Sequence, residues 1–387
     1  MANKVVFVGM SGGVDSAVSA ALLKKEGYEV VGVFIKTWHP DFIACSEEEE
    51  RRDAMRIAAQ LDIPFLTFDL EKVYKKEVAD YMIREYRAGR TPNPDVMCNK
   101  EVKFGVFLKK ARKMGADFVA TGHYAQKKVL KNSLALLHPA GGTFRRQNSQ
   151  ELFSLNIGVD PAKDQSYFLW TLNQKQLSKI IFPIGHLKKS EVRKLAKKFR
   201  LPVAEKKDSQ GICFLGPVDL KEFLKHYIVE LPGKIMLAPQ EAGNEKGEEI
   251  GYHDGVVFHT LGERHGFTIT KKTPSDKPYY IVGKDLKKNT LIVSQNKEIC
   301  NSTILTNYRI ESCNWISEIP KENKTYTAQI RYHGEFLPCR VKIFPHNKAE
   351  VTLQKLASGL PAKALAAAGQ SCVVYEGNVC VGGGVIV

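Results

Sequence analysis

A glycine-rich segment close to the N-terminus constrains the fold more strongly than any other feature of this sequence. The segment, GMSGGVDS at positions 9–16, follows a β-branched run at Lys4–Gly9 that is typical of a buried strand. It leads into Asp15–Glu26, where apolar residues recur at helical spacing. A strand joined to a helix by a tight turn begins the kind of crossover that connects parallel strands. The segment therefore predicts an α/β domain built on a parallel sheet.

The same alternation continues through the first half of the chain. Ser46 and Glu49 have the spacing of a capping box, so the acidic run at this point is predicted to open a helix. Further strands are predicted at Tyr28–Ile35, Pro64–Phe68 and Asp117–Thr121, and further helices at Leu70–Ala88 and Lys100–Met114. Residues 1–215 are accordingly predicted to form one parallel-sheet α/β domain.

The character of the sequence changes near Gly216. A short helix is predicted at Leu220–Ile228, and Gly- and Pro-punctuated strands follow, including Tyr326–Tyr332, Phe336–Ile343, Ala349–Leu353 and Cys372–Tyr375. We predict a small middle domain over 216–280 and a C-terminal β-barrel over 281–387, with the Lys- and Pro-rich stretch Lys271–Lys288 as the linker between them. Three domains suit a chain of 387 residues, because a typical domain has about 150.

Composition is that of an ordinary globular protein, and the charge favours a polyanionic partner. The chain is 43% hydrophobic and 26% charged, and no apolar run approaches the roughly 18 residues needed to span a bilayer. Since a signal-peptide pattern is absent as well, we expect a cytoplasmic protein without a membrane partner. The 57 basic and 42 acidic residues give a net charge of +15, which favours nucleic acid, although general solubility would also account for it. Eight cysteines without a CxxC pair indicate a reduced compartment, and we predict no metal-ligand cluster.

The glycine-rich segment also carries the first chemical signal. Its glycines allow backbone N–H groups to approach an anion, and the helix that follows adds partial positive charge. A phosphate site is therefore predicted, with a ligand-free turn as the alternative. The site is not of the Walker A type, because no lysine precedes Ser16. The string SGGVDS resembles the signature of the PP-loop ATP pyrophosphatase superfamily, whose domain is adenine nucleotide alpha hydrolase-like. The resemblance implies that ATP adenylates a substrate oxygen and that pyrophosphate is released.

Two more segments are expected at the same edge of the sheet, because ligands of open α/β folds gather at the carboxyl ends of the strands. They are Ile35–Trp38 and Thr121–Tyr124, which follow predicted strands. Together they could wall an adenosine pocket, and Gly122 would let the backbone approach a nucleotide closely. Trp38 could equally cap the core, and His123 could be a hydrogen-bonded loop residue.

Two cysteines lie in settings that favour a reactive thiolate. Cys98 follows a proline-stiffened loop that carries Asp95, and it precedes a predicted helix whose positive end favours the thiolate. Cys213, in the string DSQGICF, lies close to Lys206 and Lys207. The other cysteines are predicted to be small buried hydrophobic residues, namely Cys45, Cys300, Cys313, Cys339, Cys372 and Cys380.

Several longer strings, in order along the chain, resemble the bacterial tRNA-specific 2-thiouridylase family, also called the MnmA or TrmU family. They are PNPDVMCNKEVKFG, TGHYA, KDQSYFLW and DSQGICF, followed by GYHDG, QIRY and a C-terminal GGG, and they cover nearly the whole chain. The resemblance implies a sulfurtransferase that uses ATP and Mg²⁺ to adenylate the C2 oxygen of the wobble uridine in tRNA. Sulfur then replaces that oxygen, delivered as a cysteine persulfide that a sulfur-donor protein loads.

The same resemblance implies roles for individual residues. Cys213 would carry the persulfide, Cys98 would help to release the sulfur by forming a disulfide with Cys213, and Asp95 would be the acid and base. The residues expected at tRNA are Asn93, Pro94 and Asp95 at the target base, with Lys163, Asp164, Gln165, Arg331 and Tyr332 elsewhere. The residues expected at the nucleotide are Gly9, Met10, Ser11, Gly12, Gly13, Val14, Asp15, Ser16, Ile35 and Gly122.

A basic cluster precedes the second cysteine motif, and it is predicted to grip tRNA phosphates, with a solvated helix face as the alternative. It comprises Lys188, Lys189, Arg193, Lys194, Lys197, Lys198, Arg200, Lys206 and Lys207. Two other functions stay open. An amidating synthetase of the same superfamily would need an ammonia source, usually a glutaminase unit. This sequence begins with the phosphate-loop strand, which counts against this alternative. A noncatalytic RNA-binding protein would leave Asp95, Cys98 and Cys213 unexplained.

Overall fold

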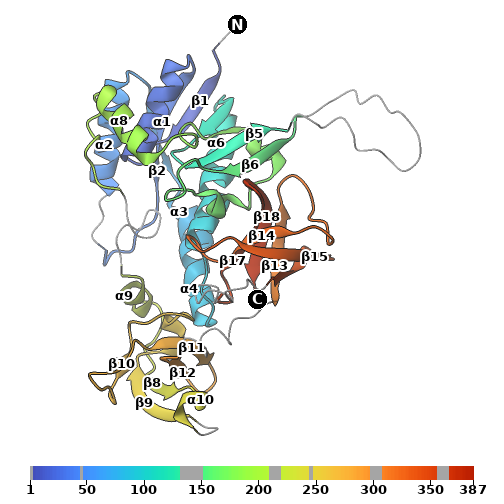
Figure 1. The fold of residues 1–387 in the computed structure, drawn as a ribbon. Helices are drawn as coiled ribbons and strands as arrows, with labels where there is room; N and C mark the ends of the chain where they lie inside the picture. The colour runs from blue at the N-terminus through green and yellow to red at the C-terminus, as the bar shows by residue number, and fades with distance from the viewer. Residues whose placement is uncertain are drawn as a thin grey trace, which may run out of the picture.

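The computed structural model describes residues 3–43, 47–130, 151–208, 219–243, 247–296, 307–354 and 366–387. Figure 1 shows an α/β domain at the N-terminal end, a small β domain at the far end of the molecule, and a β-barrel beside the helices that join the two. The predicted α/β class with a middle domain and a C-terminal barrel is confirmed.

The N-terminal domain is built on a sheet of five strands in the order β3-β2-β1-β4-β7, and every pairing in it is parallel. Its strands are β1 (Val5–Gly9), β2 (Glu29–Lys36), β3 (Phe65–Asp69), β4 (Phe118–Ala120) and β7 (Ile180–Ile181). The sequence predicted all of these except β7, whose length leaves no periodicity to detect. Chain order reverses between β1 and β4, which makes their carboxyl ends the expected place for a ligand.

Helices cover both faces of this sheet, because its strands are apolar on both sides. Val6 and Val8 pack with α1 (Val14–Lys25), α2 (Glu47–Gln60) and α8 (Lys189–Lys198) in one core cluster. Phe7 and Val33 face the other cluster, which includes the helical runs α3 (Glu71–Tyr74), η1 (Lys75–Ala79) and α4 (Asp80–Arg87), and α5 (Pro94–Met97), η2 (Cys98–Phe107) and α6 (Leu108–Lys113).

The second of these helical runs begins earlier than predicted, at Pro94 rather than Lys100. Asn93 caps it, since its side chain accepts a hydrogen bond from the Val96 N–H at 3.2 Å, and proline is well suited to the first helical position. The middle of the run, η2, is a π-helix. Helical segments of this kind are rare and occur frequently at functional sites.

The middle domain is a sheet in the order β10-β9-β8-β12-β11. Its elements are α9 (Leu220–Lys225), β8 (Gly233–Leu237), α10 (Pro239–Ala242), β9 (Glu248–His253), η4 (Val256–Phe258), β10 (Thr268–Ile269), β11 (Tyr280–Asp285) and β12 (Thr290–Ser294). The predicted boundary at 280 and the predicted linker Lys271–Lys288 are therefore wrong. Ile281, Leu291 and Val293 are buried in the same cluster as β8 and β9. The stretch instead comprises the loop between β10 and β11, strand β11 itself and the exposed turn of the β11–β12 hairpin, which carries Lys287 and Lys288.

The C-terminal strands form a closed barrel in which β13 pairs with both β16 and β18. Its strands are β13 (Asn307–Trp315), β14 (Tyr326–Gln329), β15 (Leu337–Phe344), β16 (Lys348–Leu353), β17 (Ser371–Glu376) and β18 (Val379–Ile386). The hairpin of β5 (Ala125–Val129) and β6 (Phe153–Ile157), from the first half of the chain, joins this sheet through β18. Between β6 and β7 lie η3 (Ser166–Leu169) and α7 (Gln174–Leu177). In the part of the chain that the structure describes, no helix is long and apolar enough to cross a membrane.

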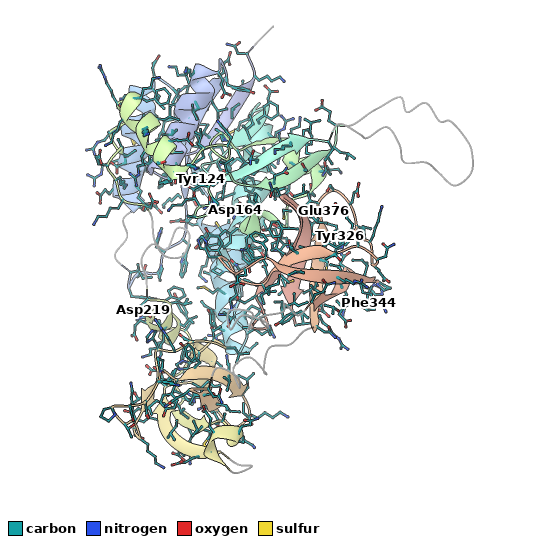
Figure 2. All side chains as sticks on the ribbon, viewed as in Figure 1. Tyr124, Asp164, Asp219, Tyr326, Phe344 and Glu376 are labelled. Carbon is teal, nitrogen blue, oxygen red and sulfur yellow. The ribbon has the colours of Figure 1, made fainter. Side chains whose placement is uncertain are left out.

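The barrel and the N-terminal domain are also joined by buried hydrogen bonds around η3. Ser166 Oγ lies 3.2 Å from the Tyr375 hydroxyl, and the Tyr167 hydroxyl donates to the Ser371 carbonyl oxygen at 2.8 Å. Asp164 lies at this junction (Figure 2). These contacts fix the position of the barrel relative to the end of the parallel sheet.

Candidate active site

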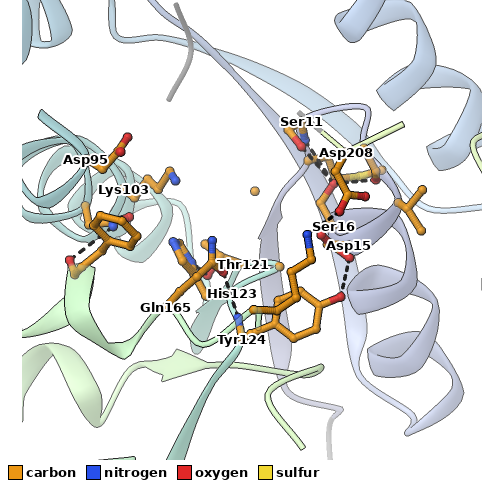
Figure 3. A pocket seen from close by; sticks show the side chains of 18 of the residues that line it. Ser11, Asp15, Ser16, Asp95, Lys103, Thr121, His123, Tyr124, Gln165 and Asp208 are labelled. Atoms are coloured by element: carbon orange, nitrogen blue, oxygen red, sulfur yellow. Dashed lines mark hydrogen bonds and ion pairs between the residues drawn. The ribbon is translucent and has the colours of Figure 1, made fainter. Parts of the chain in front are cut away.

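A cavity of about 530 Å³ lies at the carboxyl ends of β1 and β4. The glycine-rich loop and the start of α1 form one wall, and the helical run 94–107 forms the opposite wall, as the positions of Asp15 and Asp95 in Figure 3 show. The turn after β4 and the segment around Gln165 lie between these walls, and the barrel contributes Tyr332. This is the site that the strand order predicts.

The glycine-rich loop holds its shape through hydrogen bonds of its own. Ser16 Oγ accepts from the Ser11 N–H at 3.2 Å and donates to the Gly13 carbonyl oxygen at 3.1 Å. Gly12 has a φ of +67°, and a Cβ there would overlap the backbone of Glu50. Gly13 caps α1 without a side chain, so the first N–H groups of the helix face the cavity with no capping partner from that residue. This arrangement is suited to an anion such as phosphate.

The turn after β4 packs directly against this loop. A Cβ on Gly122 would lie 2.8 Å from backbone atoms of Asp15 and Ser16, so only glycine allows the approach. Gly122 and Ile35 both line the cavity, as expected for residues near a nucleotide. His123 lines it too and is 6% exposed, with Nδ1 2.7 Å from Thr121 Oγ1. Burial, together with the charge of Lys103, holds the pKa of His123 well below its ordinary value, so the imidazole is neutral.

An ion-pair network lies beside the loop. Asp15 accepts hydrogen bonds from the Tyr124 hydroxyl at 2.7 Å and from Lys189 Nζ at 2.7 and 2.9 Å. Asp208 accepts from Lys163 at 2.7 Å and from Arg193 at 2.6 Å, and Lys189 Nζ lies 2.9 Å from it. Burial by itself raises the pKa of Asp208, but its hydrogen bonds from Lys163 and Lys189 outweigh this and hold the pKa below its ordinary value.

This network changes the interpretation of the basic cluster. Lys189 and Arg193 point to the cavity network, and Lys206 donates to Asp53 at 2.8 Å, so these cations already have protein partners. Lys197 pairs with Glu205 at 2.9 Å on the surface. The exposed members of the cluster are Lys188, Lys194, Lys197, Lys198, Arg200 and Lys207. Sequence alone could not separate the two groups, because α8 carries cations on both its buried and its exposed sides.

The opposite wall presents three polar residues at a spacing of four, Asp95, Asn99 and Lys103, which lie on one side of the helical run and line the cavity. Asn99 and Lys103 were not predicted as site residues, although both lie in a motif that the sequence analysis quoted. Asn93 lies elsewhere, in a second cavity of about 380 Å³ that Met97 and Lys100 also line. The structure thus separates Asn93 from Asp95, which were expected to contact the same base.

The predicted nucleophile Cys98 lies about one turn inside the same run, because the run begins at Pro94. It is therefore not at the helix N-terminus that was expected to favour its thiolate, and its thiol is not at the cavity surface. The residue is 1% exposed and belongs to the core cluster with Val102 and Phe104. Cys213, like Cys45 and Cys300, lies outside the described residues. Cys313, Cys339, Cys372 and Cys380 are buried, as predicted, and burial raises the pKa of the Cys313 and Cys339 thiols to about 12.

The residues expected at tRNA divide into two groups. Lys163, Gln165 and Tyr332 line the cavity, and the ring of Tyr332 lies 4.3 Å from that of Phe168, centroid to centroid. Asp164 instead accepts hydrogen bonds from the Gly158 and Ser166 N–H groups and from the Ser166 hydroxyl, at 2.8 to 3.1 Å. Arg331 donates to the Leu261 carbonyl oxygen at 2.7 Å and so joins the barrel to the middle domain. Burial raises the pKa of Asp164 and lowers that of Arg331.

Comparison with known proteins gives a family for the whole chain. Residues 4–217 match a model described as a tRNA methyl transferase HUP domain, residues 221–295 its PRC-barrel domain, and residues 305–386 an aminomethyltransferase beta-barrel domain. The tRNA-specific 2-thiouridylase of Nitrosomonas europaea is 42% identical over 386 residues, which are 99% of this chain and 98% of that protein. The chain belongs to the tRNA-specific 2-thiouridylase family.

Other members of the 2-thiouridylase family are similar over the same length. The protein of Geobacillus thermodenitrificans is 43% identical, with 98% of this chain and 94% of that protein covered. The protein of Streptococcus thermophilus is 42% identical with the same coverage. The resemblance deduced from the motifs is thereby confirmed. The match at 221–295 also places β11 and β12 in the middle domain, in agreement with the sheet order.

Proposed function

We propose that this protein catalyses the ATP-dependent 2-thiolation of the wobble uridine in tRNA. The observation that carries the proposal is that a single cavity lies between an anion-binding loop and a wall that carries a carboxylate. An anion-binding loop at the start of α1 faces the helical run that presents Asp95, and both lie within a chain of the 2-thiouridylase family. A nucleotide and a base can therefore meet in one site.

In this proposal the ATP phosphates bind at the loop formed by residues 9–16. Backbone N–H groups at the start of α1 supply donors, and the cations of Lys163 and Lys189 lie close by. Mg²⁺ is usually held by one or two carboxylates together with substrate phosphates. Asp15 and Asp208 lie close enough to hold one such ion together, because the Lys189 ammonium contacts both, and the ion would take the place of that ammonium. The metal would neutralise phosphate charge.

The base would bind against the wall that contains Asp95. The uridine must leave its stack to reach the cavity, and the ring pair of Phe168 and Tyr332 offers it an apolar surface. Attack of the C2 oxygen on the α-phosphate releases pyrophosphate, and the proton on N3 must leave. A persulfide sulfur then attacks C2, AMP departs, and a proton returns to N3. We assign the proton transfers to the Asp95 carboxylate.

Cys213 is the proposed persulfide carrier and Cys98 its resolving thiol. Once the outer sulfur is bonded to C2, the Cys98 thiolate would attack Cys213 Sγ. The Cys98–Cys213 disulfide forms, the S–S bond to the transferred sulfur breaks, and its electron pair stays on the sulfur at C2. Because Cys98 is buried, this step requires its end of the helical run to open. The source of the persulfide in this proposal is a separate sulfur-donor protein, and the enzyme is expected to work in the cytoplasm.

Sulfur incorporation tests the proposal directly. Purified protein, tRNA, ATP, Mg²⁺ and a persulfide donor should give 2-thiouridine at the wobble position with one pyrophosphate released per sulfur. Release of pyrophosphate with ammonia incorporation instead would support an amidating enzyme. Binding of tRNA with no product of either kind would support the noncatalytic alternative.

A further inference from the structure

Asn99 presents a buried acceptor that no group in the described chain satisfies. The residue is 3% exposed and lines the cavity. Its amide nitrogen donates to the Phe168 carbonyl oxygen at 3.3 Å, and this contact orients the amide. Its Oδ1 has no hydrogen-bond partner among the residues that the structure describes. A buried polar atom without a partner is costly, so it indicates a donor that arrives with a ligand.

The place of Asn99 indicates which ligand supplies that donor. It lies four residues after Asp95 and four before Lys103 and lines the same cavity. Asp95 and Lys103 lie on the wall opposite the glycine-rich loop (Figure 3). The phosphates belong to the loop, and they carry acceptors rather than donors. The wall of Asp95 is the proposed place of the target base.

We propose that Asn99 determines specificity for uridine, and that its Oδ1 accepts a hydrogen bond from the N3–H of the target base. The inference rests on the proposed function. Uracil has one donor on its pairing edge, N3–H, between two carbonyl acceptors. The second amide hydrogen of Asn99 is available for one of those carbonyls. Cytosine has an acceptor at N3, so it would leave Oδ1 facing a lone pair and would be rejected.

Asn99 and Asp95 then have different tasks. An amide oxygen accepts the N3–H hydrogen bond but does not take the proton, so Asn99 selects and orients the base before the reaction. When the C2 oxygen attacks the α-phosphate, the N3 proton passes to a base, which we assign as Asp95. Loss of Asn99 should therefore weaken base recognition even where no ATP is turned over.

Binding of anticodon stem-loops without ATP tests this role. Four stem-loops would carry uridine, cytidine, 3-methyluridine or 2′-deoxyuridine at the wobble position. Wild-type protein should prefer uridine to cytidine and 3-methyluridine by roughly 10-fold. Asn99→Ala and Asn99→Ser should bring both ratios close to one, mainly by weakening uridine binding. Glu101→Gln, on the same π-helix but outside the cavity lining, is the matched control and should keep the wild-type preference.

Each result has a definite meaning. An unchanged preference for uridine in an Asn99 variant that still binds ATP overturns the inference. So does wild-type protein that binds 3-methyluridine as tightly as uridine, a result that needs no variant to fold. A selective loss with 2′-deoxyuridine that Asn99→Ala abolishes would overturn it too, because Oδ1 would then bind the ribose instead. Failure of the wild-type protein to thiolate tRNA overturns the proposed function, whereas normal thiolation without dependence on Asn99 overturns only the inference.

Discussion

Lys189 and Asp15 form an ion pair of 2.7 Å inside the cavity, and the lysine side chain is only 15% exposed. The same ammonium lies 2.9 Å from Asp208. One cation therefore joins α8 to the start of α1 and to the segment that leads into the second cysteine motif. A phosphate bound at the loop would lie beside this cation.

Removing that cation should impair the adenylation step. We expect Lys189→Ala to lower kcat/KM for tRNA-dependent pyrophosphate release roughly 100-fold, since a positioned donor to developing negative charge contributes about that much. Lys25→Ala, an exposed lysine at the end of α1, is the control and should behave as wild type. Pyrophosphate release and ATP affinity would be measured for both. Normal turnover in Lys189→Ala would show that this cation takes no part in the proposed adenylation step.

The exposed side of α8 should contribute to tRNA binding. Replacing Lys197 and Lys198 by Glu should weaken binding and reduce the slope of log K against log salt by roughly one for each phosphate that the protein no longer neutralises. Affinity for ATP should not change. The matched control replaces the exposed pair Lys287 and Lys288 in the middle domain by Glu. Equal salt slopes for wild type and the α8 variant would make this side a solvated helix face.

The two proposed thiols should have separable roles, one in persulfide loading and the other in release of the sulfur. Cys213→Ser should prevent persulfide loading, whereas Cys98→Ser should allow loading and block transfer to tRNA. Mass spectrometry of each variant after incubation with a persulfide donor, followed by thiouridine analysis, checks both steps. Cys372→Ser, at a buried position in the barrel, controls for the removal of a thiol as such. A loaded and active Cys213→Ser protein would contradict the assignment.

The free energy of unfolding should depend on pH through the protonation of Asp208. Its hydrogen bonds give the carboxyl a lower pKa in the folded chain than in the unfolded chain. A group of this kind adds stability that is fully present above its unfolded pKa of about 3.9 and is lost as the pH falls through its folded pKa. The free energy of unfolding should therefore differ most between wild type and Asp208→Asn at neutral pH, and the difference should shrink below about pH 4. Urea denaturation at several pH values measures it, and a constant difference would exclude this titration.

The sequence was most informative where local rules decide the structure. The strand, glycine turn and helix at residues 4–26 are confirmed, because periodicity and glycine geometry act over a few residues. The domain boundary at 280 failed because exposed lysines in the loop before β11 and in the β11–β12 turn resemble a linker, and only tertiary pairing shows that β11 and β12 belong to the middle sheet.

Within the site, the sequence predicted which segments lie together but not the directions in which their side chains point. The loop, Ile35, Gly122 and Asp95 were predicted to lie together, and all of them except Gly12 of the loop line one cavity. Lys189 was predicted to grip tRNA phosphates together with the rest of its cluster, but the packing of Val192 and Ala196 into the core turns it towards Asp15. The burial of Cys98 was missed for the same reason, since a motif carries no information about what covers it.

The pairing of β6 with β18 has a consequence for synthesis of the chain. The β5–β6 hairpin is complete by Ile157, yet its partner edge begins only at Val379. During synthesis, the whole N-terminal domain would therefore emerge from the ribosome with the edge of β6 unpaired. That edge is covered only when β18, nearly the last segment of the chain, emerges as well. A chain truncated after the N-terminal domain would keep this edge permanently exposed, and open edges of this kind promote self-association.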